Sequence, residues 1–297
     1  MKIIVGINFV KKLHLKISEY LELIKFEHTI FALPFALSGM LIASQDKWPD
    51  ILTFVWVILA MVGGRTAAMA LNRVIDADID SNNPRTKYRA IPAGRISKFS
   101  AIILALVSFG LMIFATWQLP LICKQLLPLA ILILVVYSYT KRFTNLSHLV
   151  LGTALGAGGA GGWLAVSGAL DIPVILWGML ITFWVAGFDI IYAIQDIEFD
   201  RKHGLFSIPA ALGIKNSLIV SRLFHIITCV SLVILGILFP IGNLYWLAVI
   251  FVFLMLVYEH SLLNENDLSR LNTAFFNVNG YISIGFMLLI VLNKLIK

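Results

Sequence analysis

Two pairs of aspartates with equal spacing are the residues of this sequence best suited to chemistry. Asp76 and Asp80 are four positions apart, Asp196 and Asp200 are also four apart, and 120 positions separate the two pairs. Residues four apart lie on one face of a helix. Carboxylates gathered in one place repel one another unless a cation lies between them, and Mg²⁺ accepts one or two carboxylates while keeping positions for phosphate oxygens. The pairs predict a magnesium site that binds a diphosphate.

Basic side chains near both pairs could neutralise the charge of a departing pyrophosphate. They are Arg73, Lys141, Arg142, Arg201 and Lys202. An isolated acidic residue near a helix end is usually solvated, and Asp78 and Glu198 fit that simpler interpretation. Two matched pairs, each flanked by cations, favour the metal–diphosphate site.

The elements that carry these residues are predicted to be membrane-spanning helices. Hydrophobic residues make up 60% of the 297 residues and charged residues 13%, and the mean hydropathy is +0.92, which excludes an ordinary soluble domain. Charge is clustered between apolar runs of about the 17–25 residues that a spanning helix needs. The sequence therefore predicts an all-α multi-pass membrane protein. Its nine expected spans are 27–45, 51–74, 99–119, 121–139, 147–167, 173–195, 217–238, 241–258 and 273–293.

The nine spans divide into two four-helix halves and a ninth helix, within a single domain of residues 1–297. Each aspartate pair follows the second helix of a half, so both pairs face the same side. That side holds 18 Lys and Arg residues against 4 on the other, which predicts an inner-membrane protein with a cytoplasmic N-terminus and active site and an outside C-terminus. Residues 1–26 form a cytoplasmic segment whose 11–25 part is expected to lie on the membrane surface as an amphipathic helix.

Two shorter segments carry further expectations. Residues 81–98 contain Pro84, Pro92 and Gly94, which predicts a structured cytoplasmic loop closing over the diphosphate. Residues 152–162 are rich in glycine and alanine, and small residues in a span let helices approach closely. The two cysteines, Cys123 and Cys229, are expected to be free thiols. The net charge of +7 follows from the topology, and no motif indicates nucleic acid binding.

Three motifs resemble those of the UbiA superfamily of membrane prenyltransferases. The family pattern N-D-x-x-D-x-x-x-D resembles residues 72–80 (NRVIDADID), D-x-x-x-D resembles 196–200 (DIEFD), and Y-x-x-x-K resembles 137–141 (YSYTK). The likeness covers nearly the whole chain. It implies that Asn72, Asp76, Asp80, Asp196 and Asp200 hold Mg²⁺ against a polyprenyl diphosphate, with Tyr137 also at the diphosphate. Arg73 stands where the family often has Asp, which removes one possible ligand and adds a cation near the phosphates.

The reaction implied by this resemblance is alkylation of an electron-rich aromatic ring by an allylic cation. The apolar bundle would exclude water from the cation and house the isoprenoid tail. The base that removes the ring proton is left open among Asp189, an aspartate of either motif, and the released pyrophosphate. Asp189 lies about two turns inside its span, where an ionisable residue is a functional candidate by default. A hydrogen-bonded structural role is its alternative.

Three further residues are candidates for contact with the aromatic acceptor. Arg65 lies inside a span two turns before Asn72, and either binds a substrate carboxylate or pairs with an aspartate. Tyr192 either lines the site through its hydroxyl or packs in the core. His28, next to Glu27, either touches the acceptor or anchors the chain at the membrane interface.

Residues 26–39 and 192–213 resemble the bacterial quinone branch of the family. That branch implies 4-hydroxybenzoate of ubiquinone synthesis as the favoured acceptor, with 1,4-dihydroxy-6-naphthoate of the futalosine menaquinone route as the alternative.

An ion-coupled transporter would also use intramembrane ionisable residues and repeated halves. Transporter sites usually lie near the midplane of the membrane, whereas these acidic residues are expected together at one end of the helices. A phosphatidyltransferase would concentrate its aspartates in one motif. The expected partners are a polyprenyl diphosphate, a small aromatic acid and the lipid bilayer, with no obligate protein partner.

Overall fold

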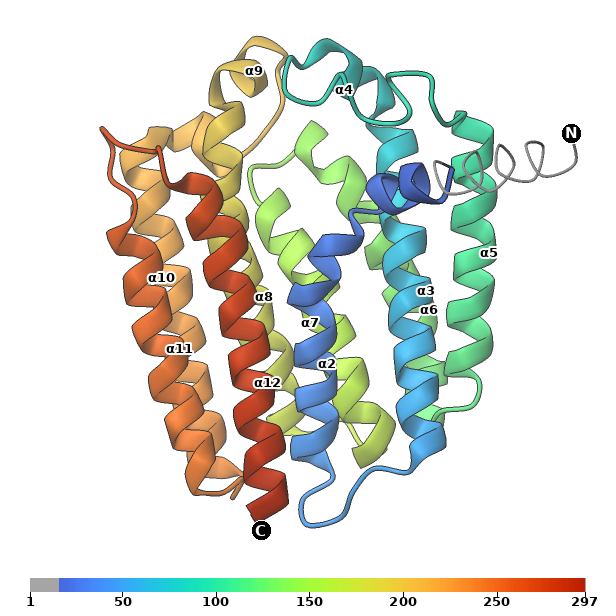
Figure 1. Ribbon diagram of the computed structural model, residues 1–297, viewed down its shortest axis with the longest axis vertical. Helices are drawn as coiled ribbons and strands as arrows, with labels where there is room; N and C mark the ends of the chain where they lie inside the picture. The colour runs from blue at the N-terminus through green and yellow to red at the C-terminus, as the bar shows by residue number, and fades with distance from the viewer. Residues whose placement is uncertain (1–15, 297) are drawn as a thin grey trace, which may run out of the picture.

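A computed structural model describes residues 16–296 of the chain, and these residues form a bundle of roughly parallel and antiparallel helices (Figure 1). The long helices are α2 (Thr29–Ala43), α3 (Ile51–Ile75), α5 (Lys98–Thr116), α6 (Leu121–Val136), α7 (Ser147–Ser167), α8 (Ile172–Ala193), α10 (Ile208–Leu238), α11 (Asn243–Ser261) and α12 (Asn279–Ile296). Short helices extend several of them, namely η1 (Phe26–His28), α4 (Ala77–Asn82), η2 (Tyr137–Arg142), η3 (Ile194–Asp196), α9 (Ile197–Lys202) and the π-helix η4 (Thr273–Val278).

Eight helical segments of the described chain are long and apolar enough to cross a membrane. They coincide with the second to ninth predicted spans, so the multi-pass all-α prediction is confirmed. The first predicted span, 27–45, is represented by η1 and α2, and α2 is only 15 residues long because the chain turns at residues 44–47. The predicted span 217–238 lies within the longer α10, which is kinked at Gly213 with a φ of 76°.

The helices pack in an order that closes the bundle. In the first half α3 packs against α5 and α6, and in the second α7 packs against α8, and α8 against α10. The ninth helix, α12, packs between α11 and α2 and so joins the last element of the chain to the first. Figure 1 shows α4 and α9 at one end of this bundle and the C-terminus at the other.

Helix α3 ends at the first aspartate of its acidic motif, and α8 ends three residues before the first aspartate of the other motif, with η3 between them. Asp76 ends α3 with φ −90° and ψ 1° and precedes α4, and Asp196 precedes α9 with φ −103° and ψ 5°. The face that each pair would share on a continuous helix is interrupted, because a short helix of six residues begins after the first aspartate of each pair. The matching breaks support the division into two related halves.

The segment between α4 and α5 is structured, as predicted. Ala90, Ile91 and Ile96 are buried in a small apolar cluster with Leu23 of the helical stretch 16–23. Arg95 on this segment pairs with Glu22, with Nη1 2.6 Å from Oε2 and Nη2 2.7 Å from Oε1. This hydrogen bond to Arg95 lowers the pKa of Glu22. The segment and the N-terminal helix thus form one layer over this end of the bundle. The predicted surface helix at 11–25 lies partly outside the described residues.

Candidate active site

Asp76 is a buried carboxylate on which three polar side chains converge. Only 3% of Asp76 is exposed. Its Oδ2 accepts hydrogen bonds from Asn72 Nδ2 at 3.0 Å and Lys141 Nζ at 2.7 Å, and its Oδ1 accepts one from Arg142 Nη2 at 3.0 Å. Asn72 comes from α3, one turn before Asp76, whereas Lys141 and Arg142 come from η2. The 3₁₀ geometry of η2 brings these two consecutive cations to the same carboxylate.

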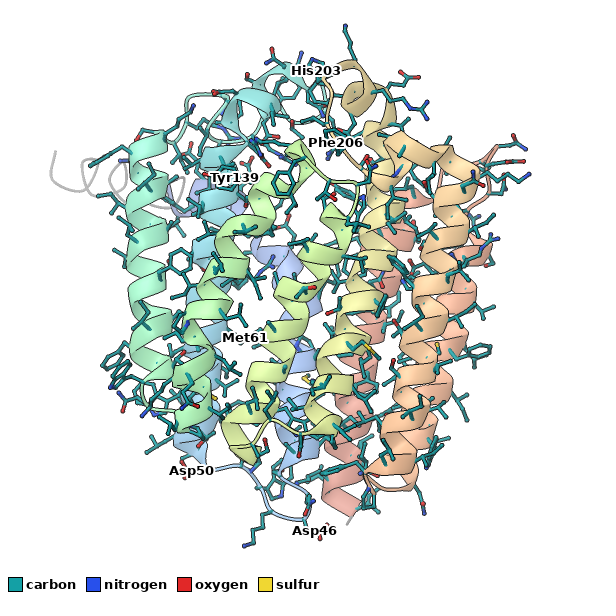
Figure 2. The ribbon with its side chains drawn as sticks, turned by 180° about the vertical axis from the view of Figure 1, so that it is seen from behind. Asp46, Asp50, Met61, Tyr139, His203 and Phe206 are labelled. Carbon is teal, nitrogen blue, oxygen red and sulfur yellow. The ribbon has the colours of Figure 1, made fainter. Side chains whose placement is uncertain are left out.

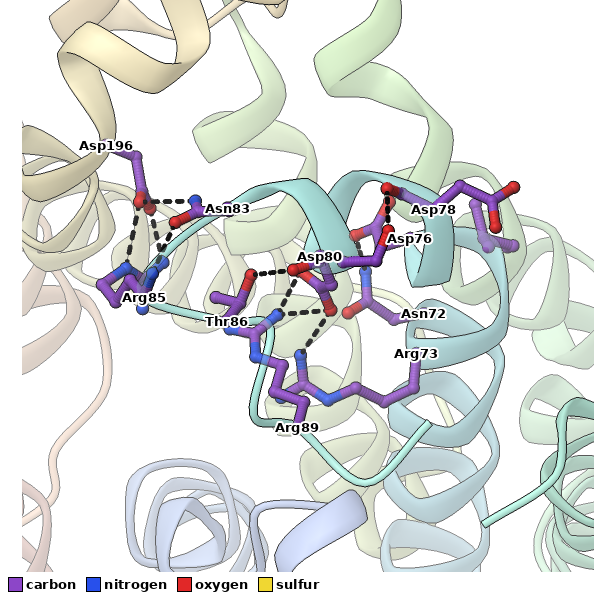
Figure 3. A network of polar contacts seen from close by, with 12 residues as sticks. Asn72, Arg73, Asp76, Asp78, Asp80, Asn83, Arg85, Thr86, Arg89 and Asp196 are labelled. Carbon is purple, nitrogen blue, oxygen red and sulfur yellow. Dashed lines mark hydrogen bonds and ion pairs between the residues drawn. The ribbon is translucent and has the colours of Figure 1, made fainter. Parts of the chain in front are cut away.

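Asp80 is equally buried and faces the loop that follows α4. Arg89 Nη1 lies 2.7 Å from Asp80 Oδ1 and 2.8 Å from Oδ2, and Arg73 Nη1 lies 3.9 Å from Oδ2 (Figure 3). Arg73 is itself buried and donates from Nε to the Leu23 carbonyl. Asp78, two residues before Asp80, projects away from this network and pairs with Lys98 at the surface.

Asp196 of the second motif is bound by the same loop. Arg85 Nε lies 3.0 Å from Asp196 Oδ1, Arg85 Nη1 donates to the Tyr192 hydroxyl at 2.9 Å, and Asn83 Nδ2 donates to Asp196 Oδ1 at 3.1 Å (Figure 3). Burial acts to lower the pKa of Arg85, but the hydrogen bond and charge of Asp196 outweigh it and raise the pKa. The loop between α4 and α5 therefore joins the two motifs through Arg85 and Arg89.

Asp200 lies on α9 with fewer partners. Its Oδ2 accepts a hydrogen bond from Ser207 Oγ at 2.9 Å, and it lies within electrostatic range of Asp196, Lys141 and His148. The chain after α9 returns to η2, where the Phe206 amide donates to the Lys141 carbonyl at 2.7 Å. This contact places Lys141 and Arg142 of η2 between the two motifs. Figure 2 shows that Phe206 and Tyr139 lie near one end of the bundle.

One cavity is lined by cations that neighbour the acidic motifs, and a second lies along the bundle. One, of about 290 Å³, is polar and is lined by cations from three segments, Lys25, Arg73, Arg85 and Arg89, together with Glu22 and Tyr192. The other, of about 310 Å³, is apolar and lies among α3, α5, α6 and α7. Its walls include Met61, which lies midway along the bundle (Figure 2). Arg65 and Tyr137 also line it, and Leu119 and Cys123 lie farther from the motifs.

The small residues of α7 serve both packing and the apolar cavity. Ala154, Gly158 and Gly161 line the cavity. Gly162 also lines the cavity, and it packs closely against α2, since a Cβ there would lie 2.2 Å from the Ala36 carbonyl oxygen. The expectation that residues 152–162 allow close helix approach agrees with these contacts, and the same stretch shapes the cavity wall.

The other residues singled out from the sequence have the following surroundings. Arg65 Nη2 donates to the Lys25 carbonyl at 3.1 Å, and the Tyr137 hydroxyl donates to the Ala68 carbonyl at 3.0 Å. Arg201 is exposed, and its Nε donates to the Ala210 carbonyl at 2.7 Å. Lys202 is exposed on α9, and the His28 side chain lies outside the described residues. Cys123 and Cys229 are free thiols, as expected.

The oxygen donors of the motifs suit Mg²⁺ when a substrate supplies the remaining ligands. In the described part of the chain, no three His, Cys, Asp or Glu side chains are grouped so that they could hold a metal alone. Mg²⁺ does not need such a group, because it usually takes one or two carboxylates and completes its octahedron with water and substrate phosphates. Each motif offers two carboxylates, and three of the four already contact a cationic side chain.

Several polar residues at the site were not singled out from the sequence as site residues. Arg85, Arg89 and Asn83 belong to the loop that was recognised as a whole, and the basic run PRTKYR was the available signal. His148 contacts Asp189, with Nδ1 2.7 Å from Oδ2. His148 is an ionisable residue within a predicted span, so the rule that selected Asp189 and Arg65 would also have selected it.

An all-helical bundle with acidic motifs at one end and an apolar cavity along it is the arrangement expected for a membrane-embedded prenyltransferase. The profile of the UbiA prenyltransferase family matches residues 32–281, and the chain belongs to this family. It is 30% identical over 251 residues to a 4-hydroxybenzoate octaprenyltransferase of Vibrio atlanticus, covering 82% of this chain and 86% of that protein. A similar enzyme of Francisella tularensis is 28% identical over 265 residues, covering 88% and 89%.

Solved structures share the fold. The apo structure of a UbiA homolog from Aeropyrum pernix is 33% identical, with a TM-score of 0.82 over 90% of this chain and 98% of that chain. A UbiA homolog from Archaeoglobus fulgidus, bound to GPP and Mg²⁺, has a TM-score of 0.73 at 19% identity, over 93% and 99%. The chain is accordingly a multi-pass prenyltransferase with the UbiA fold.

Proposed function

We propose that this prenyltransferase moves a polyprenyl group from a polyprenyl diphosphate to the ring of an aromatic acid, with 4-hydroxybenzoate as the favoured acceptor. The observation that carries the proposal is the cross-connection of Asp80 and Asp196 by Arg89 and Arg85 of one loop, beside a cation-lined cavity. A site that gathers carboxylates and guanidinium groups suits a metal-bound diphosphate, because the carboxylates hold the metal and the guanidinium groups bind phosphate oxygens.

Within the proposed site, Asp76, Asp80, Asp196 and Asp200, with Asn72, would hold Mg²⁺. When bound, Mg²⁺ neutralises charge on the diphosphate as the bond to the prenyl carbon breaks. Lys141 and Arg142 approach Asp76 within 3.0 Å and are placed to donate hydrogen bonds to phosphate oxygens. Arg73, Arg85 and Arg89 line the adjoining polar cavity and supply further donors. Arg201 and Lys202 lie farther out on α9 and would act through their charge alone.

The apolar cavity supports the second half of the proposal. Its walls of Ala, Gly, Leu and Met side chains suit an isoprenoid chain, whose burial is favourable by about 0.8 kcal/mol for each CH₂. Arg65 and Tyr137 are polar groups on this wall and would suit a diphosphate end or an acceptor carboxylate. Its apolar walls would also keep water from an allylic cation, which water would otherwise quench.

The acceptor assignment is supported by the names of similar proteins, which are 4-hydroxybenzoate octaprenyltransferases at 28–30% identity. The alternative acceptor is 1,4-dihydroxy-6-naphthoate, and the local sequence of residues 26–39 and 192–213 is equally consistent with it. We further propose that the acidic motifs face the cytoplasm in the cell's inner membrane, because most Lys and Arg residues gather on that side.

Product analysis with purified protein in lipid tests the proposal. The protein is incubated with Mg²⁺, a polyprenyl diphosphate and one of the two acceptors, and a parallel reaction contains excess EDTA. We expect one prenylated acid, formed only with Mg²⁺, and its identity names the acceptor. Prenyl diphosphate binding without product from either acid would overturn the acceptor assignment. Absence of binding would overturn the diphosphate site itself.

A further inference from the structure

His148 and Asp189 form a pair of ionisable side chains within the membrane-spanning part of the bundle. His148 lies near the start of α7 and Asp189 lies in α8, with Nδ1 2.7 Å from Oδ2. The His148 side chain is 5% exposed, whereas that of Asp189 is 23% exposed. The histidine is therefore the inner member of the pair, and the carboxylate is the member that a substrate can reach.

His148 forms a hydrogen bond through one of its two ring nitrogens in the part of the chain that the structure describes. Among the described residues, Nε2 of His148 is buried and has no hydrogen-bond partner. A buried polar atom without a partner is costly. Asp189 accepts the hydrogen bond when Nδ1 carries the proton, and Nε2 then keeps its lone pair. The contact with Asp189 is therefore the side-chain hydrogen bond that His148 makes within the described part of the chain.

Asp189 lies near the end of α8 that leads to the second acidic motif. It precedes Tyr192 by three residues, so the two lie along one side of α8, and η3 then connects α8 to Asp196. The Tyr192 hydroxyl and Asp196 both contact Arg85. His148 lies within electrostatic range of Asp200. The pair is thus next to the place where the proposed diphosphate would ionise.

We infer that His148 is a positioning residue, which orients Asp189 through its Nδ1 hydrogen bond so that Oδ1 faces the aromatic acceptor. This inference rests on the proposed function. In that reaction the bond from the prenyl carbon to the diphosphate oxygen breaks, and its electron pair leaves with pyrophosphate. A ring carbon supplies the electrons of the new carbon–carbon bond. The proton on that ring carbon passes to Asp189 Oδ1, and the electron pair of the broken C–H bond restores aromaticity.

Variants of His148 separate this role from a purely structural one. His148→Phe keeps a ring but removes the Nδ1 donor, whereas His148→Asn retains an N–H donor at the δ position. We expect His148→Phe to lower kcat about 10- to 100-fold, as loss of an orienting hydrogen bond commonly does. The KM for the prenyl diphosphate should stay within about twofold. His148→Asn should recover most of the lost kcat. Thermal unfolding in detergent checks that each variant is folded. If His148→Phe does not fold, His148→Leu is used in its place.

Two further measurements act on the proton step itself. An acceptor deuterated at the alkylated ring carbon should show a larger isotope effect on kcat in His148→Phe than in the unmodified chain, since proton removal becomes slower. In an Asp189→Asn background, His148→Phe should have little further effect, because the histidine acts through the carboxylate. Equal losses in His148→Phe and His148→Asn, an unchanged isotope effect, or additive losses in the double variant would overturn the inference. Absence of prenylated product from the unmodified chain would overturn the proposed function, and the inference with it.

Discussion

Asp78 and Asp80 are two residues apart and have opposite surroundings. Asp80 is 3% exposed and contacts Arg89, whereas the side chain of Asp78 is 90% exposed and contacts Lys98. Spacing separated them in the sequence, since Asp80 is four residues from Asp76 and Asp78 is not, and the structure shows Asp78 to be exposed, as its simpler interpretation expects. Spacing could not identify the partners, because Arg85 and Asp196 are 111 positions apart and meet only when both halves are folded.

Asp80→Asn should abolish most prenyl transfer, because the neutral amide loses charge at the proposed metal site. A loss of about 100-fold or more in kcat is expected, as for removal of one group that stabilises transition-state charge. Asp78→Asn makes the same chemical change two residues away at the surface and should leave the rate within about twofold. Rates of product formation at saturating Mg²⁺ check this. Equal rates in both variants would contradict a metal role for Asp80.

Arg89→Ala should destabilise the protein and Lys87→Ala should not. Arg89 is the close cationic partner of the buried Asp80, and loss of the partner of a buried acceptor costs about 1–3 kcal/mol, or more when that acceptor is charged. Lys87 is exposed on the same loop and lies over the Tyr88 ring. Thermal unfolding in detergent measures the difference, and added Mg²⁺ should raise the midpoint of Arg89→Ala by supplying a new cation to Asp80. A midpoint unmoved by Mg²⁺ would count against metal binding there.

At the scale of elements, the helices were predictable and their breaks were not. Apolar runs long enough to span a membrane located α3 and α7 to within one residue at each end. The breaks at Asp76 and Asp196 depend on tertiary contacts that apolar periodicity does not record. Lys141 and Arg142 contact Asp76 from another helix, and Arg85 contacts Asp196 from a loop.

Gly162→Ala should disrupt the contact of α7 with α2, whereas Gly161→Ala should be tolerated. A Cβ at Gly162 would lie 2.2 Å from the Ala36 carbonyl oxygen, and a Cβ at Gly161 would meet nothing within 4 Å. Backbone cannot yield as a flexible side chain does, so Gly162→Ala should cost about 1–3 kcal/mol. Thermal midpoints of the two variants test this expectation, and equal midpoints would show that α2 can shift without cost.

At the scale of the whole molecule, the two halves share a plan that places all the chemistry at one end. Each half has its acidic motif after its second long helix, and the loop between α4 and α5 joins the motifs. The number and order of the predicted spans were enough to predict the two halves and the position of both motifs at the same end of the bundle. Contacts such as that of α12 with α2 did not, because membrane helices carry apolar residues on all faces and the sequence gives little sign of which faces meet.

The orientation of the bundle in the membrane can be tested with single cysteines at its two ends. Asp46 and His203 are exposed and lie at opposite ends of the molecule (Figure 2). In a background with Cys123→Ala and Cys229→Ala, we expect Asp46→Cys to react with a membrane-impermeant maleimide added to intact cells freed of their outer barrier. His203→Cys should react only after the membrane is permeabilised, because the excess of Lys and Arg at its end favours the cytoplasmic side. The reverse labelling pattern would place the acidic motifs outside and remove access to a cytoplasmic diphosphate substrate.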